Sequence, residues 1–457
     1  MSKIHFIAIG GAAMHNLALA LKSKGYEISG SDDEIYEPSR SLLAQHGILP
    51  EKFGWFPEKI TSDLDAVIVG MHARADNSEL LKAQELGLAV ESYPSYLYKQ
   101  SINKQRIVIA GSHGKTSITS MVLHVLKSLG RKFDYLVGAR IEGFELMASL
   151  SDAPIIIIEG DEYLASPIDR RAKFLLYQPH ICLISGIAWD HINVYPTFES
   201  YTDSFKTLLH GLPKAGSLFF DQTDVVLNEL IAECPEHCEK TGYEAHPANI
   251  ENGQTILKGE DGKAYPIQVF GEHTLKNLNG ARLICEQIGV APTEFYEAMT
   301  TFKGAAKRLE LVASSTTSLL YKDFAHAPSK VKATTQALKN QFPNRKLIAC
   351  LELHTFSSLN PAFLPAYEGT LDLADEAFIY LSEHAREIKR MDRIEESVVQ
   401  TYFKHPKLKV IRDAETLQKT LQSDSWSNSN ILMMSSGTFD GVDLPSLGEA
   451  QGLSRVQ

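Results

Sequence analysis

The stretch RIVIAGSHGKTSITS, residues 106–120, decides the fold that we expect of this chain. Its first residues form an apolar run typical of a buried strand, glycines follow, and a helical pattern begins near Lys115. A strand, a glycine loop and a helix in this order direct backbone N–H groups and the positive end of the helix dipole at phosphate. Lys115 would reach the β- and γ-phosphates of a nucleotide, and the hydroxyl of Thr116 would bind Mg²⁺.

One position departs from the usual phosphate-loop signature. That signature, G-x-x-x-x-G-K-[ST], has a glycine where this chain has Ile109. The departure argues against a standard phosphate-loop nucleoside triphosphatase. It leaves a shorter G-x-x-G-K-T loop, or an ordinary strand-to-helix turn with a chance GKT, as the alternatives.

Strand and helix patterns alternate on both sides of this stretch. Before it, KIHFIAIGG from Lys3, YEISGSD and LDAVIVG predict strands, with a helix over residues 14–24. After it, APIIIIEGDEY and HICLISGIAWDH predict strands, residues 217–270 are more β-like, and HTLKNLNGARLICEQIGV predicts a helix. A third series begins near Leu309 with the strand candidates SLLYKDF, KLIACLEL, EAFIYL, LKVI and NILMMSS.

Such alternation is typical of parallel, doubly wound sheets. We therefore expect an α/β fold with three domains. They are an N-terminal Rossmann-like domain (1–102), a central P-loop ATPase-type α/β domain (103–308) and a C-terminal Rossmann-like α/β domain (309–457), with a polar linker near residues 101–105.

Composition excludes several classes of protein. The 457 residues carry a net charge of -11, which argues against a general nucleic-acid binder. Five scattered cysteines fit a reducing compartment better than a disulfide framework. The apolar run at the N-terminus is too short for a signal peptide, and no stretch reaches the ~20 apolar residues of a membrane span. We expect a cytoplasmic protein with no membrane partner.

Acidic residues and a histidine follow the next two strands of the central domain. Glu159, Asp161 and Glu162 come after four consecutive isoleucines, and Asp190 and His191 end the following strand. Ligands of open α/β sheets bind at the carboxyl edge, where carboxylates suit a hard cation on nucleotide phosphates. A solvated acidic turn explains EGDEY equally well, and a lone histidine is more often structural.

The N-terminal loop has the place of a dinucleotide fingerprint without its G-x-G-x-x-G pattern. Residues 10–14 read GGAAM, and Asp32 ends the second strand, where an acidic side chain often binds a ribose. The loop can still approach a pyrophosphate at the helix N-terminus. A dinucleotide oxidoreductase is a rival interpretation, but it leaves GKT and EGDE unexplained.

Taken together, these stretches resemble the Mur ligase family, the ATP-dependent amide-forming ligases of peptidoglycan assembly. The matching stretches follow one order through nearly the whole chain: IGGAAM, SGSD, GSHGKTS, EGDEY, WDH, GEHTLKN, KRLEL and KDFAHAP. The loop GSHGKTS is similar to the family's shorter G-T-x-G-K-T-[TS], which accounts for the isoleucine at position 109.

The resemblance implies site residues in all three domains. Catalytic roles fall on Lys115, Glu159, His191 and Arg308, and Mg²⁺ would be held by Thr116, Glu159 and His191. ATP would bind Gly111, Ser112, His113, Gly114, Lys115, Thr116, Ser117, Asn277, Arg308 and Asp323. The UDP-sugar would bind Gly10, Gly11, Ala12, Ala13, Met14 and Asp32. His273 falls in the motif near the adenine, and His326 on a third-domain histidine.

The chain departs from the family pattern at several of these motifs. Thr274 replaces an asparagine near the adenine, Lys322 an aspartate, and Ala327 a histidine. His354 stands where the family's L-E-P-R-S-N-T-M has an arginine, in the domain that receives the incoming amine. Some members carry a carbamylated lysine at about the place of Lys206, but the members most similar to this chain are not thought to need it.

The expected substrates are ATP, UDP-N-acetylmuramate and an amine. One kind of family member attaches the tripeptide L-Ala-γ-D-Glu-meso-diaminopimelate during peptidoglycan recycling, and another adds L-alanine during synthesis. The segments HARADN, IDRRAKF, DFAHAP and SSGTFDGV are more similar to the recycling members, whose last motif reads S-N-G-G-F-G-G-I. The resemblance thus implies the tripeptide ligase, as a monomer or weak homodimer, with the L-alanine ligase as the alternative. A non-catalytic UDP-sugar-binding relative is the third interpretation.

Overall fold

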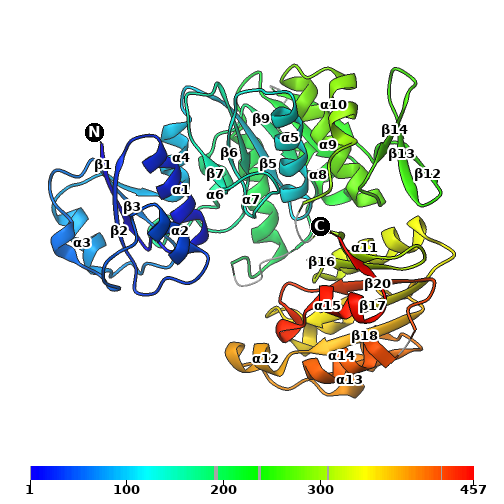
Figure 1. The fold of residues 1–457 in the computed structure, drawn as a ribbon. Coiled ribbons are helices and arrows are strands. Elements are labelled where there is room, and N and C mark those ends of the chain that lie inside the picture. Colours follow the sequence, from blue (N-terminus) through cyan, green and yellow to red (C-terminus); the bar gives the residue numbers. More distant parts are fainter. Residues whose placement is uncertain (1, 190–193, 235–237, 306–307, 424, 457) are drawn as a thin grey trace. The chain divides into compact units, whose positions relative to one another are not determined.

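The computed structural model describes residues 2–189, 194–234, 238–305, 308–423 and 425–456. The chain forms two compact units (Figure 1). The first consists of Met1–Glu244 and Asn277–Ala298, and the second of Ala245–Lys276 and Met299–Gln457. Within the described residues, no helix is long and apolar enough to cross a membrane.

The first unit begins with a parallel four-stranded sheet in the order β2-β1-β3-β4. Its strands are β1 (Lys3–Ile7), β2 (Glu27–Ser31), β3 (Ala66–Val69) and β4 (Val90–Ser92). The helices around it are α1 (Ala12–Ser23), α2 (Ser39–Gln45), η1 (Pro57–Lys59), α3 (Ser78–Glu85) and α4 (Tyr93–Gln100).

The second sheet of this unit has the order β11-β10-β9-β5-β8-β6-β7 and is parallel except for β7. Its strands are β5 (Gln105–Ala110), β6 (Asp134–Leu136), β7 (Ala148–Ser149), β8 (Ile155–Glu159), β9 (Ile181–Ile184), β10 (Ser217–Asp221) and β11 (Glu239–Tyr243). The helices are α5 (Lys115–Ser128), α6 (Lys173–Leu176), α7 (Phe198–His210), α8 (Val225–Ala232), α9 (Glu272–Gln287) and α10 (Pro292–Met299). Residues 272–276 of α9 and Met299 of α10 belong to the second unit.

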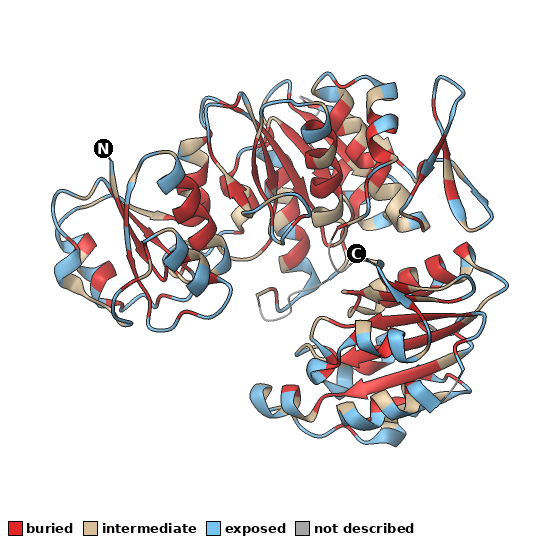
Figure 2. Cartoon of the chain, in the orientation of Figure 1, coloured by how far each residue is buried: buried red, intermediate tan, exposed pale blue. Residues whose placement is uncertain are grey.

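The two sheets of the first unit share one core. A single hydrophobic cluster continues from Ile4 and Phe6 of the first sheet to Val108 and Ile158 of the second. Parallel strands with helices on both faces are buried on both faces, which is why these strands read as continuous apolar runs. Figure 2 shows the central strands as mostly buried, among them β1, β3, β5, β8 and β9.

The second unit contains a small antiparallel sheet, β12-β13-β14, and a seven-stranded sheet in the order β19-β18-β17-β20-β16-β15-β21. In the larger sheet β15 pairs antiparallel with both β16 and β21, and all other pairs are parallel. The strands are β12 (Ala248–Glu251), β13 (Gln254–Lys258), β14 (Ala264–Ile267), β15 (Glu310–Ser314), β16 (Leu319–Asp323), β17 (Lys346–Leu353), β18 (Glu376–Leu381), β19 (Leu408–Ile411), β20 (Ser429–Met434) and β21 (Ser454–Arg455). The helices are α11 (Pro328–Gln341), η2 (Pro361–Tyr367), α12 (Glu383–Lys389), α13 (Glu396–Phe403), α14 (Ala414–Ser423), η3 (Phe439–Gly441) and α15 (Leu444–Ala450).

The predicted α/β class with parallel, doubly wound sheets is confirmed. Every strand named from the sequence is present, whereas the short strands β4, β6, β7, β15 and β21 were not predicted. The domain boundaries proposed after residues 102 and 308 stay predictions.

Candidate active site

The glycine loop lies at the carboxyl edge of β5, the middle strand of its sheet. Gly111 and Gly114 have φ of +116° and +74°, and Gly114 is the N-cap of α5. A Cβ at Gly111 would lie 2.5 Å from Ser185 Oγ, so only glycine fits against β9's end. No side chain caps α5, which leaves its first backbone N–H groups directed into the loop.

Ile109 belongs to the strand rather than to the loop. It is fully buried and lies between Glu159 of β8 and Leu183 of β9 in the sheet register. Because a glycine in a central strand weakens packing, the isoleucine suits this position. The loop therefore begins only after Ala110, as the shorter G-x-x-G-K-T form requires.

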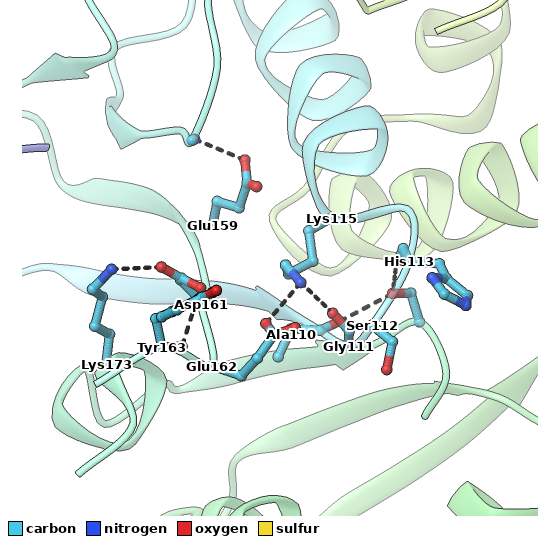
Figure 3. Close-up of polar contacts among 12 residues, drawn as sticks. Ala110, Gly111, Ser112, His113, Lys115, Glu159, Asp161, Glu162, Tyr163 and Lys173 are labelled. Atoms are coloured by element: carbon cyan, nitrogen blue, oxygen red, sulfur yellow. Dashed lines mark hydrogen bonds and ion pairs between the residues drawn. The ribbon is translucent and has the colours of Figure 1, made fainter. Parts of the chain in front are cut away.

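Lys115 is held over the loop by two oxygen partners (Figure 3). Its Nζ donates to the carbonyl of Gly111 at 2.6 Å and forms an ion pair with Glu162 Oε2 at 2.8 Å. Burial opposes the charge of Lys115, but the carboxylates around it, led by Glu162, outweigh burial and raise its pKa. The lysine is thus a fixed cation at the mouth of the loop.

Thr116 and Glu159 form a second pair beside the loop. The Thr116 hydroxyl donates to Glu159 Oε1 at 2.8 Å, and the backbone N–H of Gly138 donates to Oε2 at 2.9 Å. Burial raises the pKa of the Glu159 carboxyl, while the Gly138 N–H and the charge of Lys115 oppose that rise. A cation bound between the hydroxyl and the carboxylate would offset the free-energy cost of burying the charged carboxylate.

The residues present fit Mg²⁺ on a bound nucleotide. Mg²⁺ is usually held by one or two carboxylates together with substrate phosphates and water. Thr116 and Glu159 supply such oxygens beside the phosphate loop. Among the described residues no group of three or more His, Cys, Asp or Glu side chains forms a metal site by itself. His191 and Asp190 lie outside the described residues.

Among the other loop residues, Ser112 is hydrogen-bonded to neighbouring segments of the same unit. Ser112 Oγ is 2.8 Å from the Tyr201 hydroxyl and accepts a hydrogen bond from Ala188 N at 2.7 Å. His113 and Ser117 are partly exposed in the loop and the first turn of α5. Asn277 of α9 packs against the loop, since a Cβ at Gly114 would lie 2.2 Å from its Oδ1.

The segment IDRRAKF contacts the acidic motif directly. Lys173 Nζ forms an ion pair with Asp161 Oδ2 at 2.5 Å, and the backbone N–H of Phe174 donates to the Asp161 carbonyl. Figure 3 shows Asp161 turned toward Lys173 and Glu162 toward Lys115. The two neighbouring carboxylates thus bind different lysines, and the segment fixes the turn that carries Glu162.

The predicted UDP-sugar loop connects β1 to α1. Met14 is buried, whereas Gly10, Gly11, Ala12 and Ala13 are partly or fully exposed at a helix N-terminus without a side-chain cap. Asp32 is buried, and its Oδ2 accepts the N–H of Gly10 at 2.7 Å. Burial, together with Asp33, raises the pKa of Asp32 to about 6.

The remaining predicted residues lie in the second unit. Arg308 stacks its guanidinium over the ring of Phe324, 4.7 Å from the centroid. Asp323 is buried and accepts the N–H groups of Leu309 and Ala325, both at 2.6 Å. His326 is 2.8 Å from the carbonyl of Phe324. This brings Arg308, Asp323 and His326 together at the carboxyl end of β16.

Lys206 lies on α7 and forms a partly exposed ion pair with Glu233 at 3.0 Å. His273, in the first turn of α9, is partly exposed.

Sequence reasoning named Glu162 only as one of three carboxylates and missed its pairing with Lys115. It also missed Gly138 and Tyr201, which hold Glu159 and Ser112. The apolar run YLV before Gly138 is a weak strand signal that would have placed this glycine at the same sheet edge. No local signal indicates the contacts of Tyr201, because they join segments 89 residues apart.

Comparison with known proteins gives a consistent result. The family model described as Mur ligase middle domain matches residues 109–285, and the one described as Mur ligase family, catalytic domain, matches residues 3–104. The chain is 26% identical over 449 residues to UDP-N-acetylmuramate--L-alanyl-gamma-D-glutamyl-meso-2,6-diaminoheptandioate ligase of Escherichia coli (strain K12), covering 96% of each chain. It is 30% identical over 367 residues to UDP-N-acetylmuramate--L-alanine ligase of Sulfurihydrogenibium sp. (strain YO3AOP1), covering 79% of this chain and 78% of the relative.

Among solved structures, the fold is similar to a murein peptide ligase from Psychrobacter arcticus. The TM-score is 0.65 at 21% identity, with all of both chains covered. At this identity the likeness concerns the fold alone.

Proposed function

The chain belongs to the Mur ligase family, and on that premise we propose that it is the tripeptide ligase of peptidoglycan recycling. Members of this family are ATP-dependent ligases, which supports the same general activity here. The proposed reaction joins UDP-N-acetylmuramate to L-Ala-γ-D-Glu-meso-diaminopimelate and forms ADP. The observation that carries the choice of amine is the similarity to the Escherichia coli ligase over 96% of both chains.

The geometry of the loop supports a phosphoryl transfer. A carboxylate oxygen of the muramate attacks the γ-phosphorus of ATP, ADP leaves, and an acyl phosphate forms. Such transfers depend on positioning and on neutralising charge. Lys115 would exchange Glu162 for phosphate oxygens, and the first N–H groups of α5 would bind the remaining oxygens. Mg²⁺ held by Thr116 and Glu159 would neutralise the developing charge on the phosphates.

The second step forms the amide. The amine of the alanine residue attacks the acyl carbon, inorganic phosphate leaves, and the nitrogen loses a proton. Arg308 and Asp323 are proposed to contact ATP, Asn277 to lie near the nucleotide, and residues 10–14 with Asp32 to bind the UDP-sugar. His191 is kept as a proposed metal and active-site residue. A cytoplasmic location and a monomer or weak homodimer stay predictions.

The test measures ADP release from ATP with UDP-N-acetylmuramate and either the tripeptide or L-alanine. We expect release with the tripeptide. Lys115→Ala should abolish it while leaving UDP-sugar binding, measured by calorimetry, largely intact. Lys132→Ala is the matched control, because Lys132 is exposed beyond the end of α5. Full turnover by Lys115→Ala would refute the loop assignment.

The alternative function is the L-alanine ligase, which the 30% identity to the Sulfurihydrogenibium protein favours. Release with L-alanine and none with the tripeptide would establish it. A non-catalytic relative that binds the UDP-sugar would form no ADP with either amine. Clear binding of NADH in a spectroscopic titration would instead support the interpretation as a dinucleotide oxidoreductase.

A further inference from the structure

The ion pair of Lys115 and Glu162 belongs to a larger set of buried hydrogen bonds beside the phosphate loop. Glu162 is 1% exposed, and its Oε2 lies 2.8 Å from Lys115 Nζ. Its other oxygen, Oε1, lies 3.5 Å from the hydroxyl of Tyr201 on α7. The same hydroxyl lies 2.8 Å from Ser112 Oγ. One tyrosine hydroxyl thus contacts both the loop and the carboxylate that pairs with the loop's lysine.

The ring of Tyr201 is held in place by aromatic neighbours. Tyr201 is fully buried and packs edge-on against Tyr195 and Phe205, with ring centroids 5.1 Å and 5.3 Å away. Phe205 in turn packs against Phe174 at 5.2 Å. Because the ring supplies this packing, replacing Tyr201 by phenylalanine removes the hydroxyl and leaves the aromatic contacts in place.

The direction of these hydrogen bonds follows from the groups that form them. Ser112 Oγ accepts the N–H of Ala188 at 2.7 Å, so its own proton can be donated to the oxygen of Tyr201. An ionised carboxylate only accepts, so Tyr201 donates to Glu162. The backbone carbonyl of Glu162 accepts the hydroxyl of Tyr195 at 2.6 Å, which fixes the residue at the end of this chain of hydrogen bonds.

Nucleotide binding would change the surroundings of Glu162. In the proposed reaction Lys115 turns from Glu162 to the phosphates, because the carboxylate and the phosphates compete for one ammonium. The buried carboxylate then loses a cation, and a buried charge is costly unless other groups compensate it. The 3.5 Å contact with Tyr201 is long for a hydrogen bond to a carboxylate, so it can shorten as the lysine leaves.

We propose that Tyr201 is a positioning residue for ATP binding, whose hydroxyl stabilises Glu162 once Lys115 has turned to the phosphates. The inference rests on the proposed function and adds to it a residue that acts through Glu162. Ser112 orients the hydroxyl from the loop side, with and without nucleotide. Tyr201 thereby lowers the free-energy cost of taking Lys115 away from its carboxylate partner.

The test measures the Kd for ATP, with a fluorescent analogue, in a double-mutant cycle of Tyr201→Phe and Glu162→Gln. Alone, Tyr201→Phe should raise the Kd about 5- to 30-fold, since a strong hydrogen bond is lost with ATP bound and a weaker one without it. With Glu162→Gln there is no charge to stabilise, so Tyr201→Phe should change the Kd less than about threefold. KM for ATP should rise while kcat stays within about twofold, because Lys115 contacts the phosphates in both the ground state and the transition state.

A second background and a matched control separate this effect from a general disturbance of the site. In the Lys115→Ala protein no ammonium leaves Glu162 when ATP binds, so Tyr201→Phe should leave the remaining ATP affinity unchanged. Tyr195→Phe is the control, because it removes a hydroxyl from the same aromatic group and a hydrogen bond to the same residue, but to its backbone carbonyl. The effect of Tyr195→Phe on the Kd should therefore be the same with and without Glu162→Gln.

Two results would overturn the inference while the proposed function stands. One is an equal rise in the Kd caused by Tyr201→Phe with and without Glu162→Gln, since the tyrosine would then not act through the carboxylate. The other is a cycle in which Tyr201→Phe is coupled to Ser112→Ala and not to Glu162→Gln, which would assign Tyr201 to the shape of the loop. Absence of ADP release by the unmodified protein with either amine would refute the proposed function, and the Kd values would still decide the inference.

Discussion

Replacing Gly114 by alanine tests the phosphate loop most directly. Gly114 has φ of +74°, and a left-handed backbone costs a residue with a Cβ about 1–2 kcal/mol. The new Cβ would also lie 2.2 Å from Asn277 Oδ1. Because that oxygen ends a side chain that can rotate, its displacement adds about 1 kcal/mol, the low end for overpacking. The sum is about 2–3 kcal/mol.

This cost should appear as weaker nucleotide binding. The free loop of the variant relaxes, and ATP must restore the left-handed turn before the backbone N–H groups converge on phosphate. We expect the Kd for ATP to rise roughly 30- to 150-fold, measured with a fluorescent ATP analogue. Gly130→Ala is the matched control, since Gly130 follows the other end of α5 with φ of +64° and open space around its Cα. The Gly130→Ala variant introduces the same kind of backbone strain outside the loop, so the Kd for ATP should be unchanged.

A double-mutant cycle separates the two parts of the cost. Asn277→Ala removes the steric conflict with the new Cβ. In that background, Gly114→Ala should weaken ATP binding only by the contribution of the left-handed backbone. The Gly114→Ala variant binding ATP like the unmodified protein would refute the assignment of the loop. An effect of Gly114→Ala that is the same with and without Asn277 would refute the proposed contact.

Three further predictions concern two buried carboxylates and the proposed Mg²⁺ ligand Glu159. Glu79→Ala leaves His5 Nε2 and the N–H of Phe56 without their acceptor inside the first unit, so the free energy of unfolding should fall by about 2–5 kcal/mol. Glu79→Gln should lose less, and an unchanged melting temperature for the alanine variant would contradict the prediction. Burial raises the pKa of Asp32 to about 6, so its protonated form stabilises the fold below about pH 4 and that contribution is lost as the pH rises through 6. Melting curves of Asp32→Asn should lack this decline, and equal pH profiles would count against it. Glu159→Gln weakens one charged contact, so half-maximal ADP release should need about tenfold more Mg²⁺; the same requirement in both proteins would exclude Glu159 as a ligand.

Local patterns were sufficient to predict most of the fold. β5, β8, β9, β17 and β20 are central strands, and their two buried faces leave continuous apolar runs in the sequence. Strands at or near the sheet edges, such as β7 and β21, have two residues each and bury little, so no periodic signal marks them. The core that the two sheets of the first unit share joins segments far apart in the chain, which sequence patterns do not show.

The sequence by itself determined the glycine loop, because a strand, φ-permissive glycines and a helix start are all local features of residues 106–120. It also placed Lys115 and Thr116 on the first turn of α5. Only the tertiary structure decided their partners. Glu162, Glu159 and Asn277 reach the loop from 43 to 163 residues away in the chain, through strand register and helix packing. Such contacts depend on which strands become neighbours, and that choice is made by burial of the whole core rather than by any single segment.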